Sequence, residues 1–185
     1  LDASGRVIVW NAACEALTGM SADRVVGTRD HWRAFYGAKR PCLADLLFEA
    51  RLAEVDQYYP IHRQSPGLAH GVHAENWCVM PLRGNQLYLE IDAGPIYDDA
   101  GDLVAVVETL RDMTLRHCAE SRLRTLFERS PDPVWIIENG RFVECNDAAV
   151  QTLRYAGKEQ LLNVHPSQLS PKKQPDGEDS YTKAR

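Results

Sequence analysis

The sequence predicts an α+β fold: an antiparallel sheet with helices on one face, then a linker helix and part of a second, similar domain. Apolar residues alternate along 85–97, as in a half-buried strand, and a turn-forming segment joins this run to a second apolar run at 102–112. The N-terminal segment also recurs 135 residues later. Two long strands joined by a turn, with helix-prone sequence before them, are typical of an antiparallel sheet covered on one side.

The composition indicates a globular protein, with 44% hydrophobic and 25% charged residues among 185. The net charge is −5, and no basic stripe is visible that could meet the phosphates of a nucleic acid. No apolar run reaches the roughly 18–20 residues of a membrane span, so we expect no membrane contact by this segment. The five cysteines are odd in number and scattered, which favours a reducing, cytoplasmic compartment.

The repeat begins each predicted domain. "GRVIVWNAACEALTGMSADRV" (5–25) aligns without a gap on "GRFVECNDAAVQTLRYAGKEQ" (140–160). Both copies have a turn, a short β-branched or aromatic strand (6–10 and 141–145), and an Asn that can cap a helix. Each continues into a second short helix, beginning near Ser21 in the first copy and near Gly157 in the second.

The first copy continues through 28–57, which is rich in helix formers, and through a stretch punctuated by His, Pro and Gly. Strict alternation then predicts a strand at 85–97 with one apolar face, formed by Leu87, Leu89, Ile91 and Ala93. "DDAGD" at 98–102 is a turn signal, and 103–111 is the last strand.

These segments resemble the PAS domain family, the small sensory α+β domains of bacterial signalling proteins. The resemblance rests on "DASGRVIVWNAACEALTGMSADRVVGT" at the start, "GPIYDDAGDLVAVVETLRDMT" at the end, and a closing Asp-x-Thr at 112–114. "HWRAFYGAKRPCLADLL" (31–47) is similar to a PAS subgroup found in sensor kinases and diguanylate cyclases. The resemblance implies a PAS domain at 1–114 with its first strand missing, a linker helix at 115–130, and the N-terminal half of a second PAS domain at 131–185.

The junction at 112–115 is predicted to pass a signal from the sheet to the linker helix. Asp112 and Thr114 can each cap that helix, and Arg116 is a helical partner for Asp112. Apolar or small residues recur at a short coiled-coil spacing on the helix: Ala119, Leu123, Leu126 and Ser130. This spacing predicts a homodimer through the linker helix and PAS surfaces, while a plain connector whose leucines pack on their own domain is the alternative.

In PAS domains that bind a ligand, it lies between the sheet and the helices. The resemblance therefore implies a candidate pocket in which Arg40 and Asp45 would orient a ligand or pair with each other. Its apolar walls would be formed by Trp32, Phe35, Tyr36, Leu43, Leu46 and Leu47 on one side, and by Leu87, Leu89, Ile91 and Val107 on the other. The same residues would equally make an ordinary packed core.

No cofactor is assigned, and a small molecule, haem or FAD stays open. His62, His70 and His73, followed by Cys78, could supply zinc ligands, but their spacing is not diagnostic, so no metal is predicted. A phosphate-binding glycine loop, a GxSxG elbow and HExxH are all missing, so no catalytic residue is assigned to this segment.

The sequence is therefore interpreted as a cytoplasmic sensory and dimerisation region. We expect it to relay a signal to an output domain of the same chain, outside this segment. The parent protein could itself be anchored to a membrane. A histidine kinase of a two-component system is the first expectation for that output, and a diguanylate cyclase is the second. A ligand-free protein–protein interaction module is the alternative of a different class.

Overall fold

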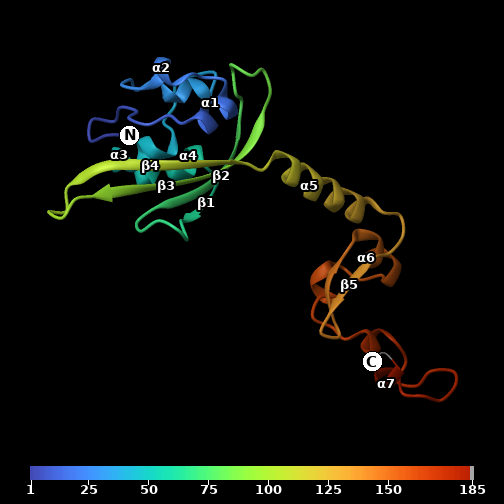
Figure 1. Ribbon diagram of the computed structural model, residues 1–185. Helices are drawn as coiled ribbons and strands as arrows, with labels where there is room; N and C mark the ends of the chain where they lie inside the picture. Colours follow the sequence, from blue (N-terminus) through green and yellow to red (C-terminus); the bar gives the residue numbers. More distant parts are fainter. Residues whose placement is uncertain (184–185) are drawn as a thin grey trace. The chain divides into compact units, whose positions relative to one another are not determined.

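The computed structural model describes residues 1–183 and divides into two compact units, Leu1–His117 and the part from Cys118 onward. The elements of the first unit, whose α-helices and strands are labelled in Figure 1, are α1 (Ala12–Thr18), α2 (Ala22–Val25), the 3-10 turn η1 (His31–Ala34), α3 (Leu43–Phe48), the 3-10 turn η2 (Leu52–Glu54), α4 (Val55–Tyr58), β1 (Ile61–Gln64), β2 (Val72–Cys78), β3 (Leu87–Tyr97) and β4 (Leu103–Asp112).

The four strands form one antiparallel sheet in the order β1-β2-β3-β4, and the helices cover one of its faces (Figure 1). The predicted alternation is confirmed, because Leu87, Leu89, Ile91 and Ala93 are all buried against the helices. The predicted turn is also confirmed: the Asp98 N–H donates to Asp102, and the Asp98 side chain accepts from two backbone N–H groups.

The core lies between this sheet and helices α1 to α4. Leu43, Leu46 and Phe35 come from the helical side and meet Leu89 and Ile91 from the strands. Burial of five such side chains contributes on the order of 1.5–3 kcal/mol each. Ala50, with a left-handed φ of 54°, ends the helical run that begins at α3, so the predicted helix-rich stretch is divided into short pieces.

The N-terminal strand predicted at 6–10 is wrong as a strand of the sheet. The backbone of Val7 forms hydrogen bonds with Thr28 and Gly27 in the loop after α2, and the segment has no strand partner in the part of the chain that the structure describes. An isolated bridge joins Asp2 to Ala105 of β4. The predicted cap that follows is confirmed: the Asn11 side chain accepts from the Cys14 N–H at the start of α1.

Helix α5 (Thr114–Arg129) begins directly after β4, with only Met113 between them (Figure 1). Its range agrees with the helix predicted from the sequence to within one residue at each end. None of its residues is buried. Throughout the described residues, no helix combines the length and the apolarity that crossing a membrane requires.

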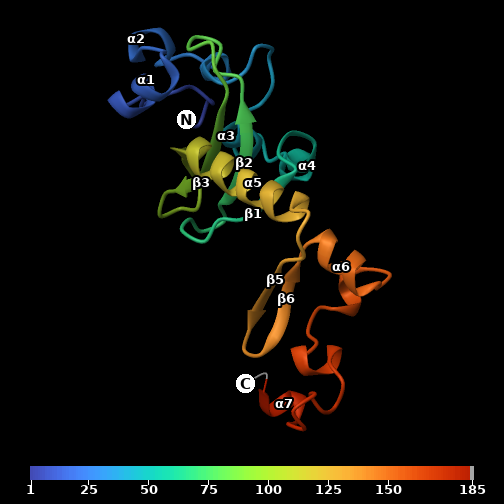
Figure 2. The ribbon, with the colours of Figure 1, turned by 90° about the vertical axis from the view of Figure 1, so that its right-hand side faces the viewer.

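The second unit contains β5 (Trp135–Glu138), β6 (Arg141–Cys145), α6 (Asp147–Leu153), η3 (Lys158–Gln160), η4 (Pro166–Leu169) and α7 (Ser180–Lys183). Strands β5 and β6 form the hairpin seen in Figure 2. Asn139 and Gly140 both have positive φ, as a tight two-residue turn requires. The strand predicted at 141–145 is therefore confirmed in this copy, and its core is small, with Cys145, Ala149 and Leu161 buried.

Asn146 caps α6 as predicted, through a hydrogen bond that its side chain accepts from the Ala149 N–H. The same oxygen accepts from Val134, and the amide nitrogen donates to the carbonyls of Phe127 and Asp132. Each polar atom of this fully buried side chain is therefore satisfied.

Candidate functional site

A cavity of about 80 Å³ lies between strand β4 and the N-terminal part of the first unit. Its lining includes Trp10, Cys14, Phe35 and Leu110. Phe35 is the one predicted pocket residue that lines it. A groove of about 330 Å³ shares Cys14, Glu108 and Leu110 with the cavity, so the two spaces adjoin.

Glu108 gives this mostly apolar cavity one of its polar groups. It lies on the inner face of β4, between Val106 and Leu110, and its carboxylate accepts from the Ala44 N–H at 2.7 Å. Burial raises the pKa of Glu108 above its ordinary value. The carboxyl group can therefore hold a proton at a pH where an exposed glutamate is ionised.

His31 is the second polar group in the lining. Its Nε2 lies 3.0 Å from the Asp45 carboxylate, and its buried Nδ1 has no hydrogen-bond partner within residues 1–183. Asp45 also accepts from the Cys42 N–H, so this carboxylate holds both the start of α3 and the imidazole. The predicted ligand-orienting role of Asp45 stays untested, and its visible role is to position His31.

The other predicted wall residues separate into two places. Tyr36, Leu46, Leu89 and Ile91 lie in the filled core, together with Leu43 and Leu87. The hydroxyl of Tyr36 lies 3.1 Å from that of Tyr59, and burial raises the pKa of Tyr36. Val107 was predicted to face the helices, which is wrong: the alternation of β4 places Val106 and Glu108 on that face instead.

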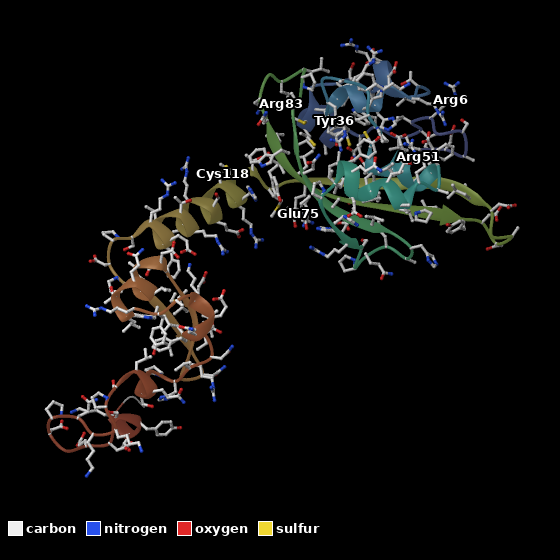
Figure 3. All side chains as sticks on the ribbon, turned by 180° about the vertical axis from the view of Figure 1, so that it is seen from behind. Arg6, Tyr36, Arg51, Glu75, Arg83 and Cys118 are labelled. Carbon is white, nitrogen blue, oxygen red and sulfur yellow. The ribbon has the colours of Figure 1, made fainter. Side chains whose placement is uncertain are left out.

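Trp32, Arg40 and Asp45 line a separate, polar depression of about 260 Å³ beside α3. The Arg40 guanidinium lies 4.1 Å from the centre of the Tyr36 ring and donates to the Tyr58 carbonyl. Figure 3 shows Tyr36 among the helices above the sheet. Arg40 is thus stacked on tyrosines rather than paired with Asp45.

The cavity is small by the standard of ligand sites, which usually measure about 300–1,000 Å³. At about 80 Å³ it has room for a few water molecules or a ligand of a few heavy atoms. Haem and FAD are far larger and do not fit between these side chains as they stand.

The junction between β4 and α5 is fixed to the neighbouring strand β3. The Met113 N–H donates to the Tyr88 carbonyl, and the Tyr88 N–H donates to the Thr114 hydroxyl, each at 2.9 Å. Thr114 in turn donates to Asp112 through both its hydroxyl and its backbone N–H. The Asp-x-Thr sequence therefore closes the sheet and begins the helix with the same set of hydrogen bonds.

Three aromatic side chains add a second connection that the sequence did not suggest. The His117 ring, in the first turn of α5, stacks on Tyr88 with centroids 3.7 Å apart, and Trp77 of β2 packs edge-on against both rings. Trp77 and Tyr88 are cross-strand partners. An aromatic pair on the outer face beside a helix start could have indicated this contact.

The remaining relay candidates lie on α5. Leu123 and Leu126 are 67% and 70% exposed, and Arg116 is exposed one turn after Asp112.

Glu108 was not among the residues predicted from the sequence, although an acidic residue at an inner-face position of an apolar strand can indicate a polar site. His31 was also not among them, and its importance depends on the distant Asp45.

Comparisons with known proteins agree with this fold. One PAS domain family model matches residues 1–115, and a second PAS domain model matches residues 121–183. A search of curated proteins found no match.

Solved structures with similar folds include the PAS domain of Bordetella pertussis BvgS, 18% identical over 68% of this chain and 80% of that chain, with a TM-score of 0.39. An RNA-binding light-oxygen-voltage receptor is 19% identical over 65% of this chain and 29% of that chain, with a TM-score of 0.44. A PAS domain from Colwellia psychrerythraea is 20% identical over 62% of this chain and 83% of that chain, with a TM-score of 0.42.

Proposed function

Because the chain belongs to the PAS domain family, we propose that it relays a signal from its first PAS domain, through helix α5, to an output domain of the same protein. PAS domains are sensory rather than catalytic modules, and two PAS models match this chain. The observation that carries the proposal is the junction, where strand β4 and helix α5 are separated by Met113 alone.

The hydrogen bonds and the aromatic stack at Tyr88 support this relay. A displacement of β3 reaches Thr114 through a backbone N–H and reaches His117 through a stacked ring. A helix that follows its strand without a flexible segment moves when the strand moves. The first turn of α5 is therefore the element that we propose to be biased by the state of the sheet.

We propose that a small polar ligand binds in the cavity beside Glu108. Glu108 lies on the same strand that ends at Asp112, four residues along the chain. A ligand that hydrogen-bonds the Glu108 carboxyl would favour one protonation state and one position of β4. Native mass spectrometry of the purified chain tests this assignment, because a bound molecule of a few heavy atoms adds a small, defined mass.

A ligand-free interaction module is the second candidate, since most of the predicted pocket residues fill the core. In that case no added mass is found, while self-association through α5 persists.

We propose that the output domain is a histidine kinase, with a diguanylate cyclase as the second choice, and that the protein acts in the cytoplasm. The coding sequence that follows Arg185 distinguishes the two outputs.

Thr114→Val tests the junction itself. Loss of the hydroxyl leaves the Tyr88 N–H without its acceptor, a cost of about 1–3 kcal/mol. We expect faster amide hydrogen exchange at Tyr88 and through the first turn of α5, while Leu89 to Ala93 stay protected. Thr114→Ser keeps the hydroxyl and serves as the control; equal exchange in the valine variant and the wild type would contradict the relay.

A further inference from the structure

The outer face of the sheet, opposite the core, carries a cluster of one histidine and three acids. His73 and Glu75 on β2 are cross-strand partners of Asp92 and Glu90 on β3. All four point away from the face that carries Ala74, Leu89 and Ile91, since neighbouring residues of a strand alternate between faces. Figure 3 shows Glu75 on the side of the sheet opposite Tyr36.

His73 is almost completely buried at this position, with 2% of its surface exposed. Its Nδ1 lies 3.2 Å from Asp92 Oδ1, which also accepts from the Ser65 hydroxyl. An ionised carboxylate only accepts hydrogen bonds, so Nδ1 carries the hydrogen and the Nε2 of a neutral ring presents a lone pair. This Nε2 is buried and has no hydrogen-bond partner among the described residues.

The unpartnered Nε2 faces two carboxylate oxygens, Glu75 Oε1 at 3.7 Å and Glu90 Oε1 at 3.8 Å. Both distances are too long for hydrogen bonds, so a protonated ring would not be satisfied there either. Two ligand atoms bound to one tetrahedral metal ion, with bonds of about 2.0–2.2 Å, lie roughly 3.4 Å apart. Each of the two distances from Nε2 is therefore within a few tenths of an ångström of that spacing, and His73, Glu90 and Asp92 place possible ligand atoms within 4.8 Å of one another.

The surroundings match the second layer of contacts that metal-binding histidines usually have. Asp92 holds the Nδ1 hydrogen, as a carboxylate commonly does behind a metal-bound imidazole. The Tyr88 hydroxyl donates to Glu75 Oε2 at 2.9 Å and orients that carboxylate.

We propose that His73 Nε2, Glu75 and Glu90 bind a divalent transition-metal cation of the zinc class, with water as the fourth ligand. Glu75 and Glu90 are partly exposed, which gives the cation a route from solvent. Arg111, at 3.0 Å from Glu90, and Arg63, at 3.9 Å from Glu75, balance the carboxylates while no cation is bound. This site is separate from the cavity and does not depend on the proposed relay.

The sequence reasoning considered zinc at His62, His70, His73 and Cys78. The structure separates these residues: Cys78 lies on the inner, core-facing side, and His62 lies beside Asp56 and Tyr59. Only His73 of that group belongs to the proposed site, and its partners are acids from two strands.

The test is titration of the purified 185-residue chain with Zn²⁺ by calorimetry and with Co²⁺ by visible absorption. We expect one equivalent to bind with tetrahedral Co²⁺ bands and without the thiolate charge-transfer band that a cysteine ligand gives. Trp77, which packs on Tyr88, supplies a fluorescence readout of the same event.

His73→Ala should abolish this binding, and Glu75→Gln and Glu90→Gln should each weaken it by more than about tenfold. Asp92→Asn should weaken it by about 10–100-fold, as loss of such outer contacts does. His70→Ala, at an exposed loop position three residues away, is the control and should bind like the wild type.

Glu75→Gln and Glu90→Gln keep side-chain volume at half-exposed positions, so their circular dichroism spectra should match the wild type even if His73→Ala fails to fold. The proposal is overturned if the wild type shows no Co²⁺ bands. It is equally overturned if both glutamine variants bind one equivalent with wild-type affinity.

Discussion

Glu108 has an apolar neighbour two residues away on each side of the same strand face, Val106 and Leu110. Burial there raises its pKa, so the folded chain holds the Glu108 proton more tightly than the unfolded chain does. Its contribution to stability is fully present below the unfolded pKa and is lost as the pH rises through the raised, folded pKa. The carboxylate consequently destabilises the first domain at neutral pH.

Glu108→Gln should therefore raise the melting temperature of the first domain by a few degrees at pH 7.5. It should change little at pH 4, where the wild-type carboxyl is protonated. Thermal unfolding followed by circular dichroism at both pH values measures the difference. Glu138→Gln, at an exposed position on β5, is the control; a Glu108→Gln effect of equal size at pH 4 and 7.5 would contradict the assigned cause.

Single residues were predictable from the sequence where their partners are near in the chain. Asn11 and Asn146 were correctly predicted as helix caps, because a cap bonds an N–H only three residues away. Arg40 and Asp45 were grouped as ligand-orienting residues from their nearness in sequence. The structure places Asp45 beside His31, and it places Arg40 not only over the nearby Tyr36 but also over Tyr58 and Tyr59, which come from a segment farther along the chain.

Among the elements, helix α5 exposes its leucines and has no buried residue. Leu123 and Leu126 lie three residues apart, on one side of the helix, so a second copy of α5 is the partner that we propose for them. Such pairing removes both side chains from water.

Leu123→Asp should weaken self-association of the chain at least about tenfold, or roughly 1.4 kcal/mol, because it places a charge in the apolar seam. Sedimentation equilibrium measures this effect. Thr125→Asp adds the same charge at an exposed position outside the seam and should leave the affinity close to that of the wild type. An unchanged dimer affinity in Leu123→Asp would refute pairing through this face.

Long elements were predicted well, and the short N-terminal strand was not. Strands β3 and β4 carry enough alternating apolar residues for their pairing to be read from the sequence. The run at 6–10 has the same β-forming composition as β6, yet only β6 pairs with a neighbouring strand. Strand formation needs a partner for the backbone groups, and composition alone does not supply one.

In the whole molecule, the two units differ in how much apolar surface they bury. The first has a continuous core between sheet and helices, whereas the second buries Cys145, Ala149 and Leu161 with a few partly covered neighbours. Segments with few buried apolar contacts open more readily than those with many.

Amide hydrogens in 131–183 should therefore exchange faster than those in 85–112 when the whole chain is studied by mass spectrometry. The difference should be largest in the segment after Leu169, where Ser180 is the described buried residue. Comparable protection in both units would contradict this expectation. Repeating the measurement on Leu123→Asp separates protection within one chain from protection by a second copy.

The four side-chain hydrogen bonds of Asn146 join the end of the linker helix to the second domain, as does the ion pair of Lys158 with Glu128. One amide group joins the carbonyl at the end of the linker helix, the loop that follows it, the start of the β5 segment and the first turn of α6. In the proposed relay, a rotation of the linker helix would act on these segments together through one side chain. The Asn146 amide is therefore a buried contact that would couple the linker helix to the hairpin and to α6 in the proposed relay.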